Sequence, residues 1–435
     1  MRKAHLVLPC FFGLLIGSCF QVHAQVGTCS GCLDATFGAG GNGLVVNASG
    51  TSVSGIALET VTQNGVPVQK IVVDGGGFQP NGSPISVVLR YNLDGTLDTS
   101  FNGSGVTSLS GLVYGMAVQS DGKIVVAVDL PGNAAGVERL NTDGSLDASF
   151  GSGGIVSLTP SSSKNFVSAH GIVVQSDGNI VLVGNVVGTA TVWRFTTSGK
   201  LDTTFGSGGS AAISVGSPRA VAMQNVTVNG SAQPMIVIAG FSTVTLKGKS
   251  HDELAVTRLT SSGRTDTSFG SAGLVAKDFG FSSLFMGLAI DSTNRIVAAG
   301  YASPGSGDEA VVAHYNVDGS VDSGFGTNGY SFVTTLSKTQ GWALALQADG
   351  KTLVGGTSWT STGNPEMSVA RLTTTGAPDG NFGSGGYSWA DFSALGYPKG
   401  YGYGVLMQPD GKIVLAGSPA AGTGSGPIGL ARYWP

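Results

Sequence analysis

Charged side chains are scarce in this sequence: 22 Lys and Arg and 26 Asp and Glu make up 11% of 435 residues, for a formal net charge of −4. Without a basic run or face, the chain cannot hold the phosphates of a nucleic acid or the headgroups of anionic lipid. Beyond the N-terminal leader, no stretch is apolar enough to cross a bilayer. We therefore expect no nucleic-acid partner and no transmembrane segment.

Histidine and cysteine are also rare, at five and four residues, and they are scattered. A three-histidine metal centre is disfavoured for that reason. The sequence shows no nucleophile elbow, phosphate loop or zinc-protease helix motif. We expect no cofactor.

Glycine, in contrast, is abundant, with 71 residues where an average chain would have a share of roughly 7%. Such a content excludes a helix bundle, because each glycine inside a helix costs about 1 kcal/mol relative to alanine. The absence of a strict Gly-X-Y period excludes collagen, and the many aliphatic residues disfavour disorder. The composition predicts a β-rich chain with many tight turns.

Residues 1–24 have the pattern of an export signal, with Arg2 and Lys3 before a short apolar run. Cleavage before Gln25 would leave a secreted or periplasmic protein. The alternative is a lipobox over residues 15–19, in which Cys19 becomes the lipid-anchored first residue of a cell-surface protein. Both interpretations place the protein outside the cytoplasm.

A short segment, residues 25–32, follows the leader and contains the last two cysteines, Cys29 and Cys32. A lone Cys-x-x-Cys can be a redox dithiol in a reducing compartment. Since no helix-forming sequence follows it and the chain is exported, we predict a structural disulfide instead.

One motif, of the form Leu-Asp-x-x-Phe-Gly, recurs seven times along the rest of the chain. Its aspartates are Asp34, Asp98, Asp147, Asp202, Asp266, Asp322 and Asp379. Each unit also holds four short β-branched runs separated by Gly, Asp and Asn turns, which is typical of hairpin sheets. Seven units of four strands predict an all-β, seven-bladed β-propeller over residues 33–435, a single domain that we expect to be monomeric.

The order of the runs predicts how this ring closes. The chain enters the propeller with the Asp-x-x-Phe turn and the strand that follows it, residues 33–46, and it stops immediately after the fourth run of a unit, at residues 430–433. The N-terminal strand is therefore expected to complete the last blade, beside the final run.

An arginine lies eight residues before the motif aspartate in most units. The pairs are Arg90/Asp98, Arg139/Asp147, Arg194/Asp202, Arg258/Asp266 and Arg371/Asp379, with His314/Asp322 at the same spacing. Ring closure would supply a further pair, Arg432/Asp34. Because charges are so scarce here, we predict structural ion pairs at blade junctions, for which the planar arginine fork is well suited.

Several recurring strings resemble the delta-60 repeat of bacterial exported proteins: Gln-x-Asp-Gly-Lys-Ile-Val at residues 119–125 and 408–414, and Leu-Asp-x-x-Phe-Gly at residues 146–151. The resemblance implies a propeller-like exported domain without an established activity, and it supplies no catalytic residues. The first unit departs from the pattern, with Glu59 in place of the glutamine.

Oxygen-rich turns at residues 92–98 and 141–147 resemble calcium loops but lack a closing glutamate. Turn capping is the favoured interpretation, with calcium-dependent surface adhesion as an alternative.

Aromatic residues cluster late in the chain, and this cluster is our candidate ligand site. It consists of Tyr387, Trp389, Tyr397, Tyr401 and Tyr403. Such rings stack on sugars or anchor a protein partner, although packing between blades explains them as well.

Uniform repetition without one chemically unusual unit favours a non-enzymatic binding or scaffold module for an extracellular protein or glycan. The alternative is an extracellular hydrolase or lyase that acts on a polymer with acids gathered at the propeller axis. The candidate acids are Asp252, Glu253, Asp308, Glu309 and Glu366.

Overall fold

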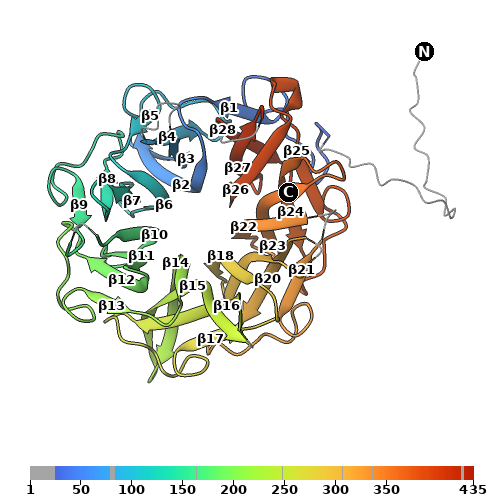
Figure 1. Ribbon diagram of the computed structural model, residues 1–435. Coiled ribbons are helices and arrows are strands. Elements are labelled where there is room, and N and C mark those ends of the chain that lie inside the picture. The colour runs from blue at the N-terminus through green and yellow to red at the C-terminus, as the bar shows by residue number, and fades with distance from the viewer. Residues whose placement is uncertain are drawn as a thin grey trace, which may run out of the picture.

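Seven four-stranded antiparallel sheets surround a common axis in the computed structural model (Figure 1). The structure describes residues 25–78, 84–162, 164–246, 248–305, 307–334, 338–422 and 426–435. The predicted seven-bladed propeller is confirmed, whereas the predicted leader, residues 1–24, lies outside the described residues. Within the described part of the chain, no helix has the length and apolar character needed to span a membrane.

Each blade takes four consecutive strands, except the last one, which takes its fourth strand from the N-terminus. The first strands lie nearest the axis (Figure 1): β2 (Val53–Gln63), β6 (Leu112–Val118), β10 (Val167–Val174), β14 (Ser217–Val228), β18 (Ser283–Ile290), β22 (Lys338–Leu346) and β26 (Lys399–Met407). The second strands are β3 (Val66–Phe78), β7 (Ile124–Leu130), β11 (Ile180–Val186), β15 (Ser231–Leu246), β19 (Ile296–Ala302), β23 (Thr352–Trp359) and β27 (Ile413–Ala420).

The third and fourth strands complete each blade toward the outside. The third strands are β4 (Pro84–Asn92), β8 (Ala134–Leu140), β12 (Thr189–Phe195), β16 (Lys249–Thr260), β20 (Glu309–Tyr315), β24 (Pro365–Leu372) and β28 (Ile428–Tyr433). The outermost strands are β5 (Val106–Ser108), β9 (Ile155–Leu158), β13 (Ser210–Ala212), β17 (Leu274–Lys277), β21 (Tyr330–Val333), β25 (Tyr387–Ala390) and β1 (Leu44–Asn47). A single turn of 3-10 helix, η1 (Ser393–Leu395), precedes β26.

The hydrophobic core lies between the faces of neighbouring blades. The second strands are buried on both faces: five consecutive residues at the start of β7 and six at the start of β11 are all buried. A strand with both faces covered needs a continuous apolar run rather than an alternating one. The uninterrupted Ile-Val-Val-Ala-Val and Ile-Val-Leu-Val sequences at these positions therefore follow from blade packing.

The Asp-x-x-Phe motif joins each blade to the next one. Its phenylalanine is fully buried in every repeat, and Phe101 packs against the turn of the following blade at Gly144. A Cβ at Gly144 would come within 2.9 Å of the Phe101 ring, and its φ of +85° favours glycine as well. Both reasons explain why a glycine recurs at this turn position.

The ring closes by strand pairing between the two ends of the chain, as predicted. β1 pairs antiparallel with β28, with Val45 opposite Leu430. Figure 1 shows the blue N-terminal strand beside the red C-terminal strands. A sheet shared by both ends keeps a propeller from opening, because its strand pairing holds the first and last segments of the chain together.

The closure also includes a tight turn that is built from both ends. In the continuous turn of the second blade, Gly144 N donates to Asn141 O at 2.9 Å. At the closure, Gly31 N donates in the same way to Trp434 O at 2.8 Å, and Trp434 N donates to Cys32 O at 3.0 Å. Ser30 and Gly31 thus stand where the other repeats have their Asp-Gly or Ser-Gly turn, although the chain is interrupted there. We call this feature the split turn.

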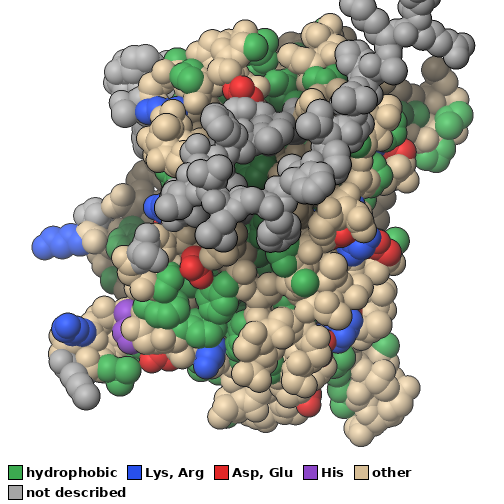
Figure 2. Space-filling view, turned by 90° about the vertical axis from the view of Figure 1, so that its right-hand side faces the viewer, with side chains coloured by type: hydrophobic (Ala, Val, Ile, Leu, Met, Phe, Trp, Pro, Cys, Tyr) green, Lys and Arg blue, Asp and Glu red, His purple; other side chains and the backbone are tan. Residues whose placement is uncertain are grey.

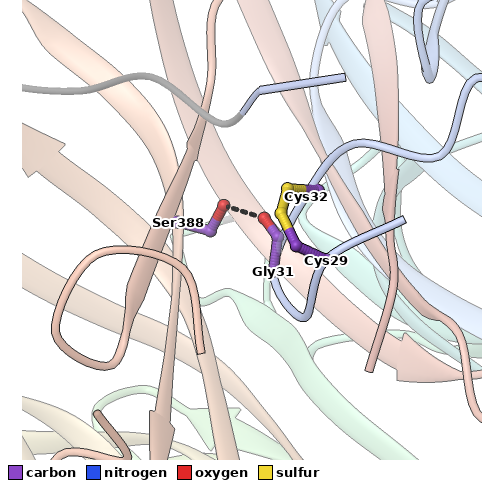
Figure 3. The surroundings of a disulfide bond; sticks show 4 residues. All are labelled: Cys29, Gly31, Cys32 and Ser388. Atoms are coloured by element: carbon purple, nitrogen blue, oxygen red, sulfur yellow. Dashed lines mark hydrogen bonds between the residues drawn. A yellow bond between two sulfur atoms is a disulfide. The ribbon is translucent and has the colours of Figure 1, made fainter. Parts of the chain in front are cut away.

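The split turn ties the sixth blade to the seventh. Ser30 O accepts from Gly383 N at 3.0 Å, and Ser388 Oγ donates to Gly31 O at 2.7 Å (Figure 3). Cys29 and Cys32 form a disulfide directly across this segment. The short segment before Leu33 is therefore part of the propeller framework.

We expect the double variant Cys29→Ser/Cys32→Ser to lower the free energy of unfolding by about 2 kcal/mol, because a disulfide restricts the unfolded chain even over a short loop. Chemical denaturation under non-reducing conditions measures the change. Ser145→Ala alters the equivalent position of the uninterrupted turn in the second blade and should cost well under 1 kcal/mol. Equal effects of the two variants would contradict a special role of the disulfide in the split turn.

Charged groups are thinly spread on the outer surface. The face seen in Figure 2 shows isolated acidic and basic side chains of both signs, and hydrophobic side chains gather at one place on it. No basic patch is visible on this face, in agreement with the low charge content.

Candidate functional site

The five aromatic residues predicted as a ligand site do not come together. Tyr387 and Trp389 lie on β25, the outermost strand of the sixth blade, with ring centroids 6.2 Å apart. Tyr397 packs against the core after η1. Tyr401 and Tyr403 lie on β26 next to the axis. As a single ligand site the five stay a prediction, and Tyr403 is the member that belongs to the site described below.

The recurrent arginines contact the motif aspartates in six blades. The N···O distances are 2.7 to 2.9 Å, for Arg90–Asp98, Arg139–Asp147, Arg194–Asp202, Arg258–Asp266, Arg371–Asp379 and Arg432–Asp34. Each of these arginines also lies over the motif phenylalanine of its own repeat, 4.3 to 4.9 Å from the ring centroid. The pairs are buried or nearly so, and most of their polar groups are engaged with one another.

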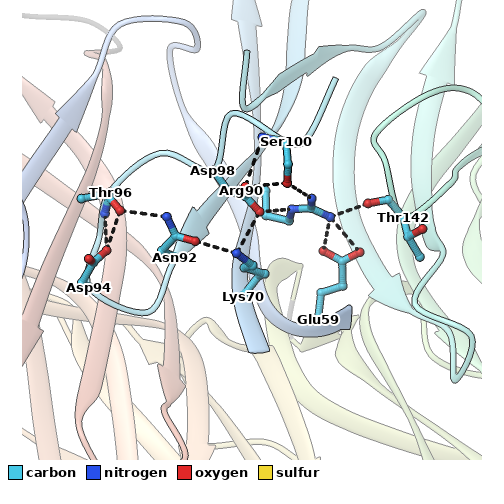
Figure 4. Close-up of polar contacts among 9 residues, drawn as sticks. All are labelled: Glu59, Lys70, Arg90, Asn92, Asp94, Thr96, Asp98, Ser100 and Thr142. Carbon is cyan, nitrogen blue, oxygen red and sulfur yellow. Dashed lines mark hydrogen bonds and ion pairs between the residues drawn. The ribbon is translucent and has the colours of Figure 1, made fainter. Parts of the chain in front are cut away.

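Figure 4 shows this network in the first blade, where Glu59 replaces the usual glutamine. Arg90 contacts Glu59 at 3.2 Å, Asp98 at 2.9 Å and the carbonyl of Thr142 in the next blade. Lys70 adds a second cation 3.2 Å from Asp98. Such a network joins blades, and its donors and acceptors are already in use, so it is a framework element rather than a ligand site.

The fifth blade departs from the series. Within the described structure, His314 makes no ion pair with Asp322 and instead stacks on Phe325, with ring centroids 3.6 Å apart. Arg295 provides the cation for Asp322, at 2.9 Å. An imidazole can replace the stacking of a guanidinium but not its fork of donors, so a second residue supplies the charge.

The acids of the enzymatic alternative are dispersed. Asp252 and Glu253 lie on β16, Glu309 on β20 and Glu366 on β24, all third strands of their blades, and Asp308 precedes β20. Asp308 forms an ion pair with Lys338 at 2.7 Å. Their carboxylates do not form a group next to the axis.

The oxygen-rich turns use their own carboxylates. Asp143 Oδ1 accepts from Ser145 N at 2.9 Å and from Ser145 Oγ at 2.6 Å, and Asp94 does the same with Thr96. This is the pattern of a capped turn. Among the described residues, no group of three or more His, Cys, Asp or Glu side chains is placed to hold a metal ion.

A different set of residues meets at the axis. Every first strand contains a β-bulge near its start, where one residue is skipped in the pairing with the second strand. The skipped residues are Ser54, Tyr114, His170, Arg219, Met286, Trp342 and Tyr403. Because the seven first strands surround the axis, these residues form one ring, which we call the bulge ring (Figure 1).

Bulges re-aim a side chain out of the regular alternation and are common next to active sites. Here they recur in all seven blades at the same register, so the backbone is repetitive while the side chains are not. Tyr114 remains 41% exposed although it lies on an innermost strand. The Asp-Gly hairpins follow the opposite ends of the same strands, so the bulge ring and the arginine–aspartate network lie at opposite ends of the propeller.

Three neighbouring members of the ring form a polar sector: Tyr114, His170 and Arg219. Tyr114 and His170 meet edge to face, with ring centroids 6.1 Å apart, and Arg219 Nη1 lies 3.4 Å from His170 Nδ1. Burial, together with the charge of Arg219, lowers the pKa of His170 to about 4. The imidazole is therefore neutral at physiological pH.

The hydrogen bonds of Asn185 fix the tautomer of His170. Asn185 Nδ2 donates to Gly216 O at 3.3 Å, which turns Asn185 Oδ1 toward His170 Nε2 at 2.9 Å. Nε2 must then carry the imidazole proton, and Nδ1 is left to accept from Arg219. This series of hydrogen bonds, from Asn185 through His170, thus orients the guanidinium of Arg219 by its Nη1.

The other arc of the ring is aromatic, and we call Tyr301, Trp342 and Tyr403 the aromatic sector. Trp342 and Tyr403 lie edge to face at 5.3 Å, and Tyr301 from the neighbouring second strand lies 5.9 Å from Trp342. In a seven-membered ring the blades of Trp342 and Tyr403 stand opposite that of His170. The cation, Arg219, lies nearer to the aromatic sector, because Tyr301 belongs to the next blade and interacts with it electrostatically.

A second set of positions supports the ring from the second strands. It comprises Gly76, Asp129, Asn185, Phe241, Tyr301, Thr357 and Ser418, at equivalent register. Phe241 lies under Arg219 at 5.5 Å, and Asp129 Oδ1 accepts from Ala169 N in the next blade at 2.7 Å. These residues hold the ring members in place.

The bulge ring was not predicted from the sequence, although a recurring sequence feature marks it. A small residue recurs at the start of each first strand, for example Gly115, Gly171 and Gly287, and the residue just before it belongs to the ring. The small residue is required because neighbouring first strands approach closely: a Cβ at Gly171 would lie 3.1 Å from Arg219 O. The residues just before this repeated small residue differ in chemical type from blade to blade, and this variety indicated a candidate site.

Comparison with known proteins identifies the repeat without assigning a role. A family model described as a domain of unknown function (DUF5122) beta-propeller matches residues 70–101, 119–150, 175–205, 292–325, 347–382 and 408–435. No curated protein matches the sequence.

Solved structures with the same architecture differ widely in sequence. Virginiamycin B lyase from Staphylococcus aureus, in a catalytically inactive form with quinupristin, is 13% identical with a TM-score of 0.50, covering 90% of this chain and 98% of its own. An ulvan lyase of polysaccharide lyase family PL25 is 9% identical (TM-score 0.47, covering 90% and 96%). Drosophila Semaphorin 1a is 8% identical (TM-score 0.42, covering 89% and 88%). These likenesses concern the fold alone. The matches to the DUF5122 beta-propeller domain of unknown function thus fall in six of the seven blades.

Proposed function

We propose that the protein is an exported, non-enzymatic binding module that holds an extracellular ligand on its bulge ring. The sequence of residues 1–24 and the resemblance to delta-60 repeats support export. The observation that carries the binding function is the ring itself: seven positions with one backbone geometry hold side chains of six chemical kinds.

Positions that hold the propeller together vary much less from blade to blade than the bulge ring does. The motif phenylalanine is the same in all seven repeats, and the arginine–aspartate pair is present in six. A position that only had to fill the space around the axis would be expected to repeat as well. Diversity confined to the ring, together with exposed aromatic surface such as that of Tyr114, is typical of a recognition surface.

The experiment is a screen of extracellular glycans and peptides with protein recovered from outside the cytoplasm. We expect a ligand that binds the wild type and loses at least tenfold in affinity for the triple variant Tyr114→Ala/Trp342→Ala/Tyr403→Ala, because the stacking surface is removed. Tyr387→Ala, on the outermost strand of the sixth blade, is the control and should bind as the wild type does. A ligand that is lost with Tyr387→Ala but kept by the triple variant would place the site elsewhere, and retention in the cytoplasm would contradict export.

An enzyme is the second candidate, favoured by the contact between a neutral imidazole, a phenol and a guanidinium at Tyr114, His170 and Arg219. Neutral His170 can accept a proton, and Tyr114 can donate one. Any ligand found in the screen is therefore incubated with the protein and analysed for cleavage. Turnover that is lost in His170→Phe, with binding retained, would decide for the enzyme.

A further inference from the structure

The bulge ring contains a cation without a counter-ion. Arg219 is partly buried, and this burial lowers its pKa. Within the described ranges, the buried framework arginines each have a carboxylate within 2.9 Å, whereas Arg219 has none within ion-pair distance. Its contacts include His170 and the ring of Phe241, and its Nε is buried without a hydrogen-bond partner among the described residues.

A guanidinium that is partly removed from water without an anion is costly, and such a group normally has a carboxylate beside it. The positions around Arg219 were open to an acid, since Asp129 and Asn185 occupy equivalent sites in the preceding blades. The chain places Phe241 there instead. The pairing partner of Arg219 is thus left to come from outside the protein.

The orientation of Arg219 is also prepared. The tautomer imposed by Asn185 lets His170 accept one proton from Arg219 Nη1. The second proton of Nη1 and the Nη2 group have no partner among the described residues and remain free to donate to a carboxylate or a sulfate. Neutral His170 adds no second positive charge, and the carboxyl of Asp129 lies against Tyr114 at the far side of the polar sector, so Arg219 can pair with one anionic group only.

We propose, resting on the binding function above, that the ligand is an acidic saccharide whose anionic group pairs with Arg219 and whose sugar ring lies on Trp342 and Tyr403. The aromatic sector provides flat apolar surface on the same side of the axis as Arg219: Tyr301, in the next blade, is near enough to interact with it electrostatically, and Trp342 lies one blade further on. A sugar that carries a carboxylate or a sulfate combines an apolar face with a single charge, and both features are matched at this end of the axis. A long polyanion such as a nucleic acid would need a row of cations, which the chain lacks.

Isothermal titration calorimetry with three oligosaccharides tests the proposal: an oligogalacturonate, a sulfated oligogalactan and a neutral cello-oligosaccharide. We expect at least one acidic oligosaccharide to bind tenfold or more tightly than the neutral one, and the better of the two identifies the anion. Arg219→Met should remove this preference, with a loss of ten- to hundredfold for the acidic ligand and little change for the neutral one. Arg219→Lys, which keeps the charge but loses the fork, should fall between these results.

Trp342→Ala separates the two halves of the proposal, because it should weaken acidic and neutral saccharides alike. Arg264→Met removes an exposed arginine from a turn at the opposite end of the fourth blade and should bind as the wild type does. Intact folding of each variant is checked by its thermal transition.

Preference for the acidic ligand that survives Arg219→Met would overturn the role of Arg219. If no saccharide binds while the screen maps a peptide to the bulge ring, the saccharide class is wrong and the ring stands as the binding surface. If the screen maps every ligand away from the ring, the binding function and this inference fail together.

Discussion

Arg432→Met is expected to lower the free energy of unfolding by about 3–5 kcal/mol, because it removes one partner of a buried ion pair. Arg432 contacts Asp34 at 2.8 Å, and the two side chains are 5% and 1% exposed. Its Nη2 also donates to Thr36 Oγ1 at 2.8 Å, and its guanidinium lies 4.7 Å from the ring centroid of Phe37. Each of these contacts joins the C-terminal strand to the N-terminal segment.

The location of this pair in the ring makes its effect larger than that of its counterparts. In the other blades the chain itself connects the arginine to the aspartate eight residues later, whereas Arg432 and Asp34 are held together only by the closure. Burial raises the pKa of Asp34, but hydrogen bonds from Thr36 and Lys412 and the charge of Arg432 lower it to about 2. Without the arginine, the buried carboxylate would keep its hydrogen bonds from Thr36 and one cation, Lys412, 3.0 Å away.

Arg194→Met is the matched control, since Arg194 makes the same contact with Asp202 at 2.7 Å within one continuous repeat. That pair is more exposed, at 11% and 13% of the side chains, and we expect a smaller loss of about 1–2 kcal/mol. Urea denaturation followed by tryptophan fluorescence measures both variants. Equal losses would show that closure contributes nothing beyond the local ion pair.

Asp74→Ala is expected to stabilise the protein at pH 8 by a few kcal/mol. Asp74 is fully buried on β3 and forms no ion pair with any described residue. Burial raises its pKa to about 7, against a partial lowering by the backbone amides of Gly55 and Asp74. The equivalent positions of four other blades hold alanine: Ala127, Ala239, Ala299 and Ala416. The substitution thus introduces a residue that this site accepts elsewhere in the chain.

The direction of the pH dependence follows from proton binding. In the unfolded chain Asp74 loses its proton near the ordinary pKa of 3.8, whereas in the folded protein it keeps the proton up to about pH 7. Its contribution to stability is therefore full below pH 4 and is lost as the pH rises to 7, by on the order of 4 kcal/mol. Asp74→Ala should flatten this part of the stability curve and change little at pH 4.

Denaturation midpoints between pH 4 and 8 test this expectation. Glu59, whose pKa burial also raises to about 7, leaves a residual slope in the variant. Glu59→Gln restores the residue found in most other repeats and serves as the comparison. Parallel curves for the wild type and Asp74→Ala would mean that Asp74 is already ionised in the folded protein.

The architecture could be predicted from the sequence because the residues that it requires recur from repeat to repeat. The buried Phe150 and its equivalents, the turn glycines and the alternating hairpins give seven copies of one signal, and even the join between Val45 and Leu430 could be predicted from the order of the strands. Because the motif recurs seven times, one departure from it, such as His314 in place of the arginine, does not obscure the pattern.

The bulge ring, which we propose as the binding surface, could not be found in the same way because its side chains do not repeat from blade to blade. Tyr114, His170 and Arg219 look unrelated along the chain, some 50 residues apart, and only the common bulge register brings them together. Closeness in sequence is likewise no guide to closeness in a propeller: Tyr387 and Tyr403 are near one another in the chain but lie on the outermost and innermost strands of neighbouring blades.

The split turn sets the direction in which the molecule would face when it is held by its N-terminus. Gly31 and Trp434 meet among the tight turns, at the opposite end of the axis from Arg219 and Trp342. A lipid, a fusion partner or a solid support joined before Gln25 would therefore sit behind the ring. Such attachment would leave the bulge ring pointing outward, toward the medium.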